Sequence, residues 1–266
     1  MDIKPTLSDL EALARQAGDI ILGGYIPRPG FERTHQVDYK GEIDLVTEMD
    51  HRSEAFLLGE IKEHFPAHQI VSEESGTQSG DDCCKWYIDP LDGTVNYAHG
   101  IPIFSVSIAF AENGELSLGV VYDPIKNECF SAQRSSGAKL NGQPLRVSTT
   151  ESLDRSLLVT GFPYDIRTTS ENNLDHYARF ALRTQGVRRL GSAALDLCYV
   201  AAGRFDGFWE FRLSPWDLAA GGLIAREAGA LVTDMQGGLN FLSPPYSLIA
   251  ANPSIHTQIM KVIREA

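Results

Sequence analysis

A β-hairpin signal near the middle of the chain constrains the fold more than any other feature. Two runs of β-forming residues, FSVSIAF (104–110) and LSLGVVYD (116–123), flank the pair Asn113-Gly114, which two-residue hairpin turns prefer. Three shorter strand-like runs lie around this hairpin: QIVSEE (69–74), KWYID (85–89) and CFSAQ (129–133). The pattern predicts one large antiparallel meander over residues 69–148.

Helical periodicity precedes the meander. Apolar residues recur at helical spacing from Leu7 to Ile21, and Ser8 with Glu11 has the spacing of a capping box. A second helix is expected from about Thr47 to His64, ended by a proline at position 66.

After residue 156, helical and strand-like segments alternate, which is typical of an α/β arrangement. We expect helices at 173–185, 192–202 and 215–228, another opened by Asn252-Pro253, and strands at 156–162, 187–190, 207–211, 231–235 and 247–251. We find neither an internal repeat nor a low-complexity linker. The prediction is therefore one domain over residues 1–266, whose approximate halves, 1–150 and 151–266, share one body.

Charge and composition narrow the functional classes. The 266 residues carry 23 Lys and Arg against 35 Asp and Glu, a formal net charge of −12. Nucleic acid is not expected as the main ligand, because a phosphate backbone demands a basic face. The four cysteines form no C-x-x-C motif, acidic and basic residues interrupt the N-terminal apolar segment, and no apolar run approaches membrane-spanning length. We expect a reduced, cytoplasmic protein with no membrane contact.

Four acidic clusters stand out: DLVTEMD (44–50), SEES (72–75), DPLDGT (89–94) and SPWD (214–217). Each has a structural explanation: SEES alone could be a solvated strand end, DPLDG alone a turn, and the other two helix caps. Asp50 follows Thr47 by three residues, and Asp217 follows Ser214 by three, so each pair fits a helix capping box.

The run WYIDPLDGT is harder to explain by structure alone. An apolar strand leads into Asp89, a second carboxylate follows at Asp92, and Gly93 and Thr94 then offer backbone N–H groups and a hydroxyl. Hard oxygen ligands suit a divalent cation, and N–H groups at a helix start suit a phosphate. Two metals can clamp the attacking and leaving oxygens of a phosphoryl displacement.

Four segments in this order resemble the inositol monophosphatase family: SEES, WYIDPLDGTVNY, GSAALDLCYVAAGRFDGFWE and SPWDLAAGGLIAREAGA. The resemblance covers nearly the whole chain. It implies a layered α/β/α/β/α sandwich, a homodimer, and a lithium-sensitive phosphomonoesterase with two to three Mg²⁺ ions per site.

The same resemblance implies a role for each matching residue. The implied metal ligands are Glu73, Asp89, the Leu91 carbonyl, Asp92 and Asp217. The implied catalytic residues are Asp50, Glu73 and Thr94, with Thr94 and Asp50 orienting the attacking water. The implied substrate contacts are Asp92, Gly93, Thr94, Gly191, Ser192, Ala193, Glu210 and Asp217; Gly93 and Thr94 would hold phosphate, and Gly191, Ser192, Ala193 and Glu210 would face the alcohol.

Several alternatives stay open at the level of sequence. The run D-G-T-x-N-Y, with Asn96, favours myo-inositol monophosphate over 3′-phosphoadenosine 5′-phosphate, histidinol phosphate, fructose 1,6-bisphosphate or NADP. A different class is an interaction protein that binds a macromolecular partner, in addition to catalysis or instead of it. The complete set of expected ligands favours an active enzyme.

Other candidate sites are weaker. His64 and His68 have metal-binding spacing, but the proline between them breaks the helix that this spacing needs. For Arg188-Arg189, a charged strand end is favoured over a contact with phosphate or a partner. The three tryptophans, Trp86, Trp209 and Trp216, are expected in the core.

Overall fold

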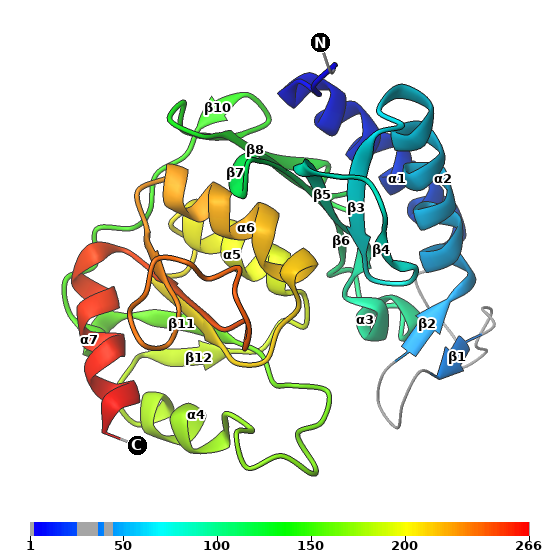
Figure 1. Ribbon diagram of the computed structural model, residues 1–266. Coiled ribbons are helices and arrows are strands. Elements are labelled where there is room, and N and C mark those ends of the chain that lie inside the picture. Colours follow the sequence, from blue (N-terminus) through cyan, green and yellow to red (C-terminus); the bar gives the residue numbers. More distant parts are fainter. Residues whose placement is uncertain (1–2, 26–36, 40–44, 266) are drawn as a thin grey trace.

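The protein is built from five layers of helices and sheets (Figure 1). The computed structural model describes residues 3–25, 37–39 and 45–265. Helices α1 and α2 cover one face of an eight-stranded sheet, and α5 and α6 cover the other. A five-stranded sheet packs on the far side of α5 and α6, and α4 and α7 lie outside it. The expected α/β/α/β/α sandwich is therefore confirmed.

The first sheet contains the predicted hairpin. Its strands, in spatial order, are β10 (Gln143–Pro144), β9 (Ala138–Leu140), β8 (Glu128–Gln133), β7 (Glu115–Asp123), β6 (Ser105–Glu112), β5 (Asp81–Asp92), β3 (His68–Ser72) and β4 (Gly76–Gln78). Asn113 and Gly114 both have positive φ angles, as the hairpin turn requires. The prediction of a purely antiparallel meander is wrong at one place, since β3 pairs with β5 in parallel.

The outer helices are α1 (Leu7–Gly24) and α2 (Glu48–His64). The predicted Ser8–Glu11 capping box of α1 is wrong: the box is formed by Thr6 and Asp9, two residues earlier. The predicted Thr47–Asp50 box of α2 is confirmed. A short strand pair, β1 (Val37–Tyr39) with β2 (Leu45–Thr47), leads into α2.

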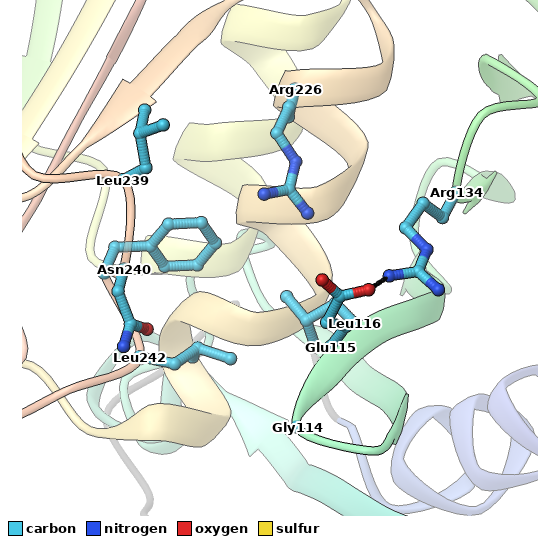
Figure 2. A pocket seen from close by; sticks show the side chains of 9 residues that line it. Gly114, Glu115, Leu116, Arg134, Arg226, Leu239, Asn240 and Leu242 are labelled. Carbon is cyan, nitrogen blue, oxygen red and sulfur yellow. Dashed lines mark hydrogen bonds and ion pairs between the residues drawn. The ribbon is translucent and has the colours of Figure 1, made fainter.

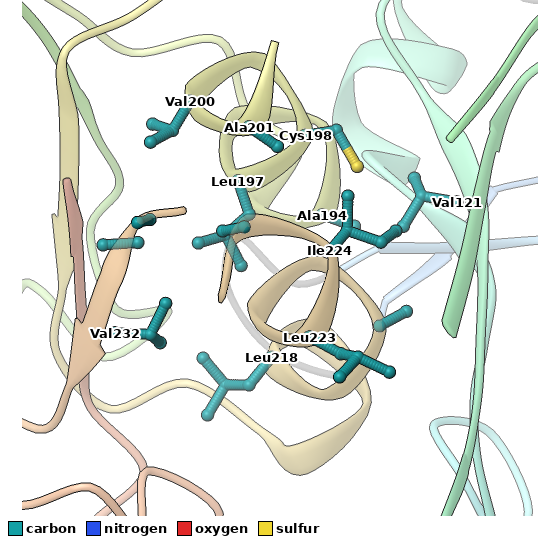
Figure 3. Close-up of a cluster of buried hydrophobic side chains, with 14 of the residues drawn as sticks. Val121, Ala194, Leu197, Cys198, Val200, Ala201, Leu218, Leu223, Ile224 and Val232 are labelled. Atoms are coloured by element: carbon teal, nitrogen blue, oxygen red, sulfur yellow. The ribbon is translucent and has the colours of Figure 1, made fainter. Parts of the chain in front are cut away.

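The central layer consists of α5 (Ala193–Ala201) and α6 (Pro215–Glu227), which pack against each other and against both sheets. Figure 3 shows this core, with Val121 of the first sheet and Val232 of the second on opposite sides of the two helices. Both helices come from the second half of the chain, yet they bury the inner face of the sheet made by the first half. The division into halves within a single domain stays a prediction.

The second sheet is mixed rather than parallel. Its strands, in spatial order, are β12 (Gly186–Arg188), β11 (Leu157–Thr160), β13 (Gly207–Glu210), β15 (Leu248–Ala251) and β14 (Leu231–Thr233). The first three are parallel and the last two join antiparallel. The remaining helices are α3 (Thr94–Ala98), α4 (Leu174–Ala181), α7 (Pro253–Arg264) and the 3₁₀ turn η1 (Leu153–Arg155), so α4 is shorter than the predicted 173–185.

All four cysteines are free thiols. In the part of the chain that the structure describes, no helix combines the length and apolar character needed to cross a membrane.

Candidate active site

A bulge at the end of β5 brings two carboxylates to one face of the first sheet. Asp89 pairs with Ser107 of β6, whereas Asp92 pairs with Ser105. The two residues are three positions apart on β5 but their partners are only two positions apart on β6, so β5 contains one extra residue here. Since side chains alternate along a strand, the extra residue returns Asp92 to the face that Asp89 occupies. Gly93 then turns the chain into α3 with φ 97°, where an added Cβ would lie 2.9 Å from the Ile103 carbonyl oxygen.

The parallel pairing of β3 with β5 sets Glu73 beside Asp89. Ser72, the last residue of β3, lies opposite Ile88, and the backbone N–H of Glu73 donates to the Ile88 carbonyl (3.2 Å). Burial, followed by the charges of neighbouring carboxylates with Glu73 foremost, raises the pKa of Asp89 well above its ordinary value. A hydrogen bond with Glu73 raises it further.

Asp217 reaches the same site from the other half of the chain. It closes the predicted capping box of α6, where its Oδ2 accepts from the Ser214 N–H (2.7 Å). The hydroxyl of Ser107 on β6 donates to the carbonyl of Trp216 (3.3 Å), which ties this helix start to the first sheet. The pKa of Asp217 is raised well above its ordinary value by burial and then by the charge of Glu73.

Asp50 and Thr94 form a buried pair next to these acids. The Thr94 hydroxyl lies 2.9 Å from Asp50 Oδ1 and 3.0 Å from the Leu91 carbonyl oxygen. The other oxygen of Asp50 accepts from the N–H and the hydroxyl of Thr47 (2.8 and 2.6 Å). Burial raises the pKa of Asp50, while these hydrogen bonds lower it.

Asp92 links the cluster of acidic side chains at the end of β5 to the start of α5. Its Oδ2 accepts from the Ser192 hydroxyl, from the Ala194 N–H (2.9 Å) and from the Ser105 hydroxyl (3.3 Å). Ser192 is the N-cap of α5, so Asp92 sits where the helix dipole favours negative charge. The expected substrate contacts Ser192 and Ala193 are therefore brought against Asp92, and the Gly191 carbonyl oxygen lies beside Gly93.

Glu210 ends β13 inside the protein, with 6% of its surface exposed. Burial raises its pKa to about 8, although the positive charge of Arg189 opposes this shift. Gly161 makes room for the carboxylate, since a Cβ there would lie 2.2 Å from Glu210 Oε1. The interpretation of Arg189 as only a charged strand end was therefore incomplete.

The sequence interpretation missed Asp196 on α5. Its side chain is buried, and its Oδ1 has no hydrogen-bond partner. Burial, and then the charges of Glu210 and Asp92, raise its pKa well above the ordinary value. The available signal was one acid inside the otherwise apolar helix AALDLCYVA, four residues after the cap Ser192.

The donor set fits a hard divalent cation. Within the described ranges, no three acidic, histidine or cysteine side chains are already closed into a metal cage. The carboxylates are nevertheless close enough that Glu73, Asp92 and Asp217 each raise the pKa of Asp89. Carboxylate and carbonyl oxygens are the ligands that Mg²⁺ takes, and a cation would relieve this repulsion. The residues that would hold it are Glu73, Asp89, Leu91 through its carbonyl, Asp92 and Asp217.

The histidine pair is not a second metal site. His68 Nδ1 accepts from the Trp86 indole N–H (3.0 Å), and His64 Nδ1 lies 2.9 Å from the Glu60 carbonyl oxygen one turn back in α2. Trp86 and Trp209 are buried as expected, whereas Trp216 is only half-buried.

A hollow of about 440 Å³ lies away from these acids, between the β6–β7 turn, α6 and the loop at residues 239–242 (Figure 2). Its two arginines are engaged within the protein. Arg134 forms an ion pair with Glu115, and the guanidinium of Arg226 lies 5.9 Å from the Phe241 ring centre. The hollow contains none of the predicted site residues.

Comparison with known proteins finds a family model, related sequences and solved structures that match this chain over nearly its whole length. The sequence model described as the Inositol monophosphatase family matches residues 2–266. The protein named Nus factor SuhB from Salmonella typhimurium is 42% identical over 262 residues, covering 98% of this chain and 96% of its own length.

Two solved structures resemble this one over nearly their whole lengths. The extragenic suppressor protein suhB from Bartonella henselae has a TM-score of 0.88 and 37% identity, covering 97% of both chains. The inositol monophosphatase from Anabaena (Nostoc) sp. PCC 7120 has a TM-score of 0.86 and 40% identity, covering 98% of this chain and 95% of its own.

Proposed function

Because the chain belongs to the inositol monophosphatase family, we propose that it hydrolyses a small phosphate monoester, with myo-inositol monophosphate as the preferred substrate and Mg²⁺ as the cofactor. One observation carries the proposal: carboxylates from both halves of the chain meet at the end of β5, where the charges of Glu73, Asp92 and Asp217 raise the pKa of Asp89 and the charge of Glu73 raises that of Asp217. Such mutual repulsion is typical of a site built around a cation.

Asp50 and Thr94 provide the route for the proton of the attacking water. A threonine hydroxyl has one hydrogen, so it donates either to Asp50 or to the Leu91 carbonyl. When it donates to Asp50, its oxygen is free to accept a hydrogen bond from water and so to orient the lone pair toward phosphorus. Mg²⁺, when bound, neutralises the phosphate charge and lowers the pKa of water.

The rest of the site binds the two ends of the substrate. The N–H groups of Gly93 and Thr94 hold the phosphate, and Gly191, Ser192 and Ala193 lie on the side of the leaving alcohol. Glu210 accepts hydrogen bonds from hydroxyl groups away from phosphorus. Its raised pKa gives it both protonation states near neutral pH, so it can donate as well as accept.

The decisive experiment measures phosphate release from purified protein with and without Mg²⁺. The substrates are myo-inositol monophosphate, 3′-phosphoadenosine 5′-phosphate, histidinol phosphate, fructose 1,6-bisphosphate and NADP. We expect the highest kcat/KM for myo-inositol monophosphate. Equal or higher kcat/KM for another substrate would replace the proposed one, and phosphate release that is independent of Mg²⁺ would refute the metal assignment.

A macromolecular partner is a second candidate role, favoured by a 42% identical relative that is named a Nus factor. We propose that this role would be independent of catalysis. The test is expression of the chain and of its Asp89→Asn variant in bacteria that lack their own SuhB. If loss of SuhB slows growth and the partner role exists, both proteins should restore the growth rate. Failure of the wild-type chain would speak against a shared partner.

We also propose a cytoplasmic homodimer, as the resemblance implies. Leu174 on the outer helix α4 and Leu182 just beyond it, 49% and 89% exposed, are the candidate contacts. Sedimentation at micromolar concentration should give twice the 29.2 kDa chain mass.

A further inference from the structure

Helix α2 buries polar side chains where a helix of this kind would bury apolar ones. Asp50, Ser53 and Glu54 are at most 4% exposed and lie on the face that Leu57, Leu58 and Ile61 continue. Residues at i, i+3 and i+4 share one face of a helix. Each of the three contacts a different loop of the candidate site.

Glu54 holds the segment that carries Glu73. Its Oε1 accepts from the Ser72 hydroxyl, the Glu74 N–H (3.2 Å) and the Ser75 N–H (3.0 Å), and its Oε2 accepts from the Ser75 hydroxyl (2.6 Å). The donors lie immediately before and after Glu73, and 18 to 21 residues separate them from Glu54.

Ser53 and Asp50 hold the other two loops. The Ser53 hydroxyl donates to the Pro90 carbonyl (2.8 Å), which lies between Asp89 and Leu91. Asp50 accepts from Thr94 at the start of α3. One turn of α2 is therefore bonded to every ligand-bearing segment of the first half of the chain.

Strand pairing holds Glu73 on the β5 side only, where its N–H donates to the Ile88 carbonyl. The ladder of β3 with β4 begins at Ser72 opposite Gly76, so residues 73–75 form the turn outside it. The N–H groups of Glu74 and Ser75 donate to a side chain from another element instead of closing that turn on itself. A buried carboxylate with four donors is strongly held, because charged hydrogen bonds are shorter and stronger than neutral ones.

We propose that Glu54 is the positioning residue for the metal ligand Glu73, and that Ser53 does the same for the Asp89–Leu91 segment. The inference rests on the proposed function, since it gives α2 the role of setting the distance between two metal-ligand loops. Removing a side chain that orients a metal ligand typically weakens metal affinity about ten- to hundredfold.

The test compares Mg²⁺ dissociation constants from calorimetry with unfolding temperatures measured without metal. Glu54→Ala should weaken Mg²⁺ binding by about ten- to hundredfold. Glu54→Gln should bind within about threefold of wild type, since its oxygen can keep two of the three donors on Oε1 and its NH₂ can donate to the Ser75 hydroxyl. Glu63→Ala, on the exposed face of the same helix, is the matched control and should bind as wild type does.

The outcomes separate this inference from the proposed function. A wild type that binds no Mg²⁺ refutes both. A wild type that binds, with Glu54→Ala matching Glu63→Ala, refutes the positioning role alone, even if Glu54→Ala unfolds earlier. Equal losses in Glu54→Gln and Glu54→Ala would point to charge rather than hydrogen-bond geometry and would also refute it.

If Glu54→Ala does not fold, Ser75→Ala decides the question. This variant removes one of the four donors and keeps the carboxylate. Mg²⁺ binding weakened at least about twofold relative to Glu63→Ala would support the proposal, and unchanged binding would overturn it.

Discussion

The Thr94 hydroxyl lies 2.9 Å from the Asp50 carboxylate, although 44 residues separate the two. Asp50 is at the same time the closing residue of the α2 capping box. A residue that the sequence explains as a helix cap therefore also has a place in the site, because its two oxygens serve different partners. Oδ2 faces Thr47 and Oδ1 faces Thr94.

Thr94→Val should lower kcat by about a hundredfold or more, the range that proton transfer by a positioned group contributes. Valine keeps the shape of threonine but has no hydroxyl to link water with Asp50. Thr94→Ser keeps the hydroxyl and should retain most of kcat. Steady-state kinetics of the two variants at saturating Mg²⁺ would test this, and equal losses would assign Thr94 a packing role.

Asp89→Asn should lose activity by more than about a hundredfold while the protein stays folded. Burial and neighbouring carboxylates already raise the pKa of Asp89, so a neutral side chain relieves repulsion in the metal-free protein. The Leu91 N–H, 3.0 Å from Asp89 Oδ1, keeps an acceptor in asparagine. We expect an unfolding temperature without Mg²⁺ equal to or above that of wild type. Full activity of this variant would refute the metal assignment.

Li⁺ at millimolar concentration should inhibit phosphate release. A small monovalent cation suits the hard oxygen donors of Glu73, Asp89 and Asp217, and its single charge would hold product phosphate without activating water. The matched control is K⁺ at the same ionic strength, which should have little effect. Equal responses to the two ions would count against this branch of the family but not against phosphatase activity.

Much of the fold follows from local sequence signals. The hairpin at Asn113-Gly114 and the caps at Thr47–Asp50 and Ser214–Asp217 are set by residues close in the chain, and all three were predicted. The parallel pairing of β3 with β5 was not, because strand direction depends on a partner that no local pattern specifies.

The residues of the site were predicted only in part. The structure brings the expected residues together, but their roles still rest on resemblance and on the experiments above. Glu54 and Asp196 carried no motif: Glu54 is one of several acids in α2, Asp196 is the single acid in α5, and the importance of each lies in partners far along the chain. The cap of α1 was misplaced because Ser8–Glu11 and Thr6–Asp9 offer the same chemistry two residues apart.

The pH dependence of stability should reveal the buried carboxyl of Glu210. Its folded-state pKa of about 8 exceeds the ordinary value of 4.5, so folding favours its protonated form. Its ionisation therefore removes stability as pH rises from about 4.5 to about 8. Without Mg²⁺, Glu210→Gln should match wild type in unfolding temperature at pH 5 and exceed it at pH 9. Glu151→Gln, an exposed acid, is the control, and a constant difference across this range would contradict the prediction.

The same variant tests whether Glu210 recognises the alcohol. Contacts to hydroxyl groups remote from phosphorus are partly uniform binding, so their loss raises KM more than it lowers kcat. Loss of the polyol partners of a buried carboxylate costs roughly 1–3 kcal/mol, about five- to two-hundredfold in kcat/KM. At pH 9, above the pKa of about 8 at which Glu210 ionises, Glu210→Gln should therefore weaken binding of myo-inositol monophosphate far more than binding of a small phosphate ester without ring hydroxyls. Equal losses on the two substrates would instead place Glu210 in the scaffold or beside the metal, and no loss on either would leave it without a role in substrate binding.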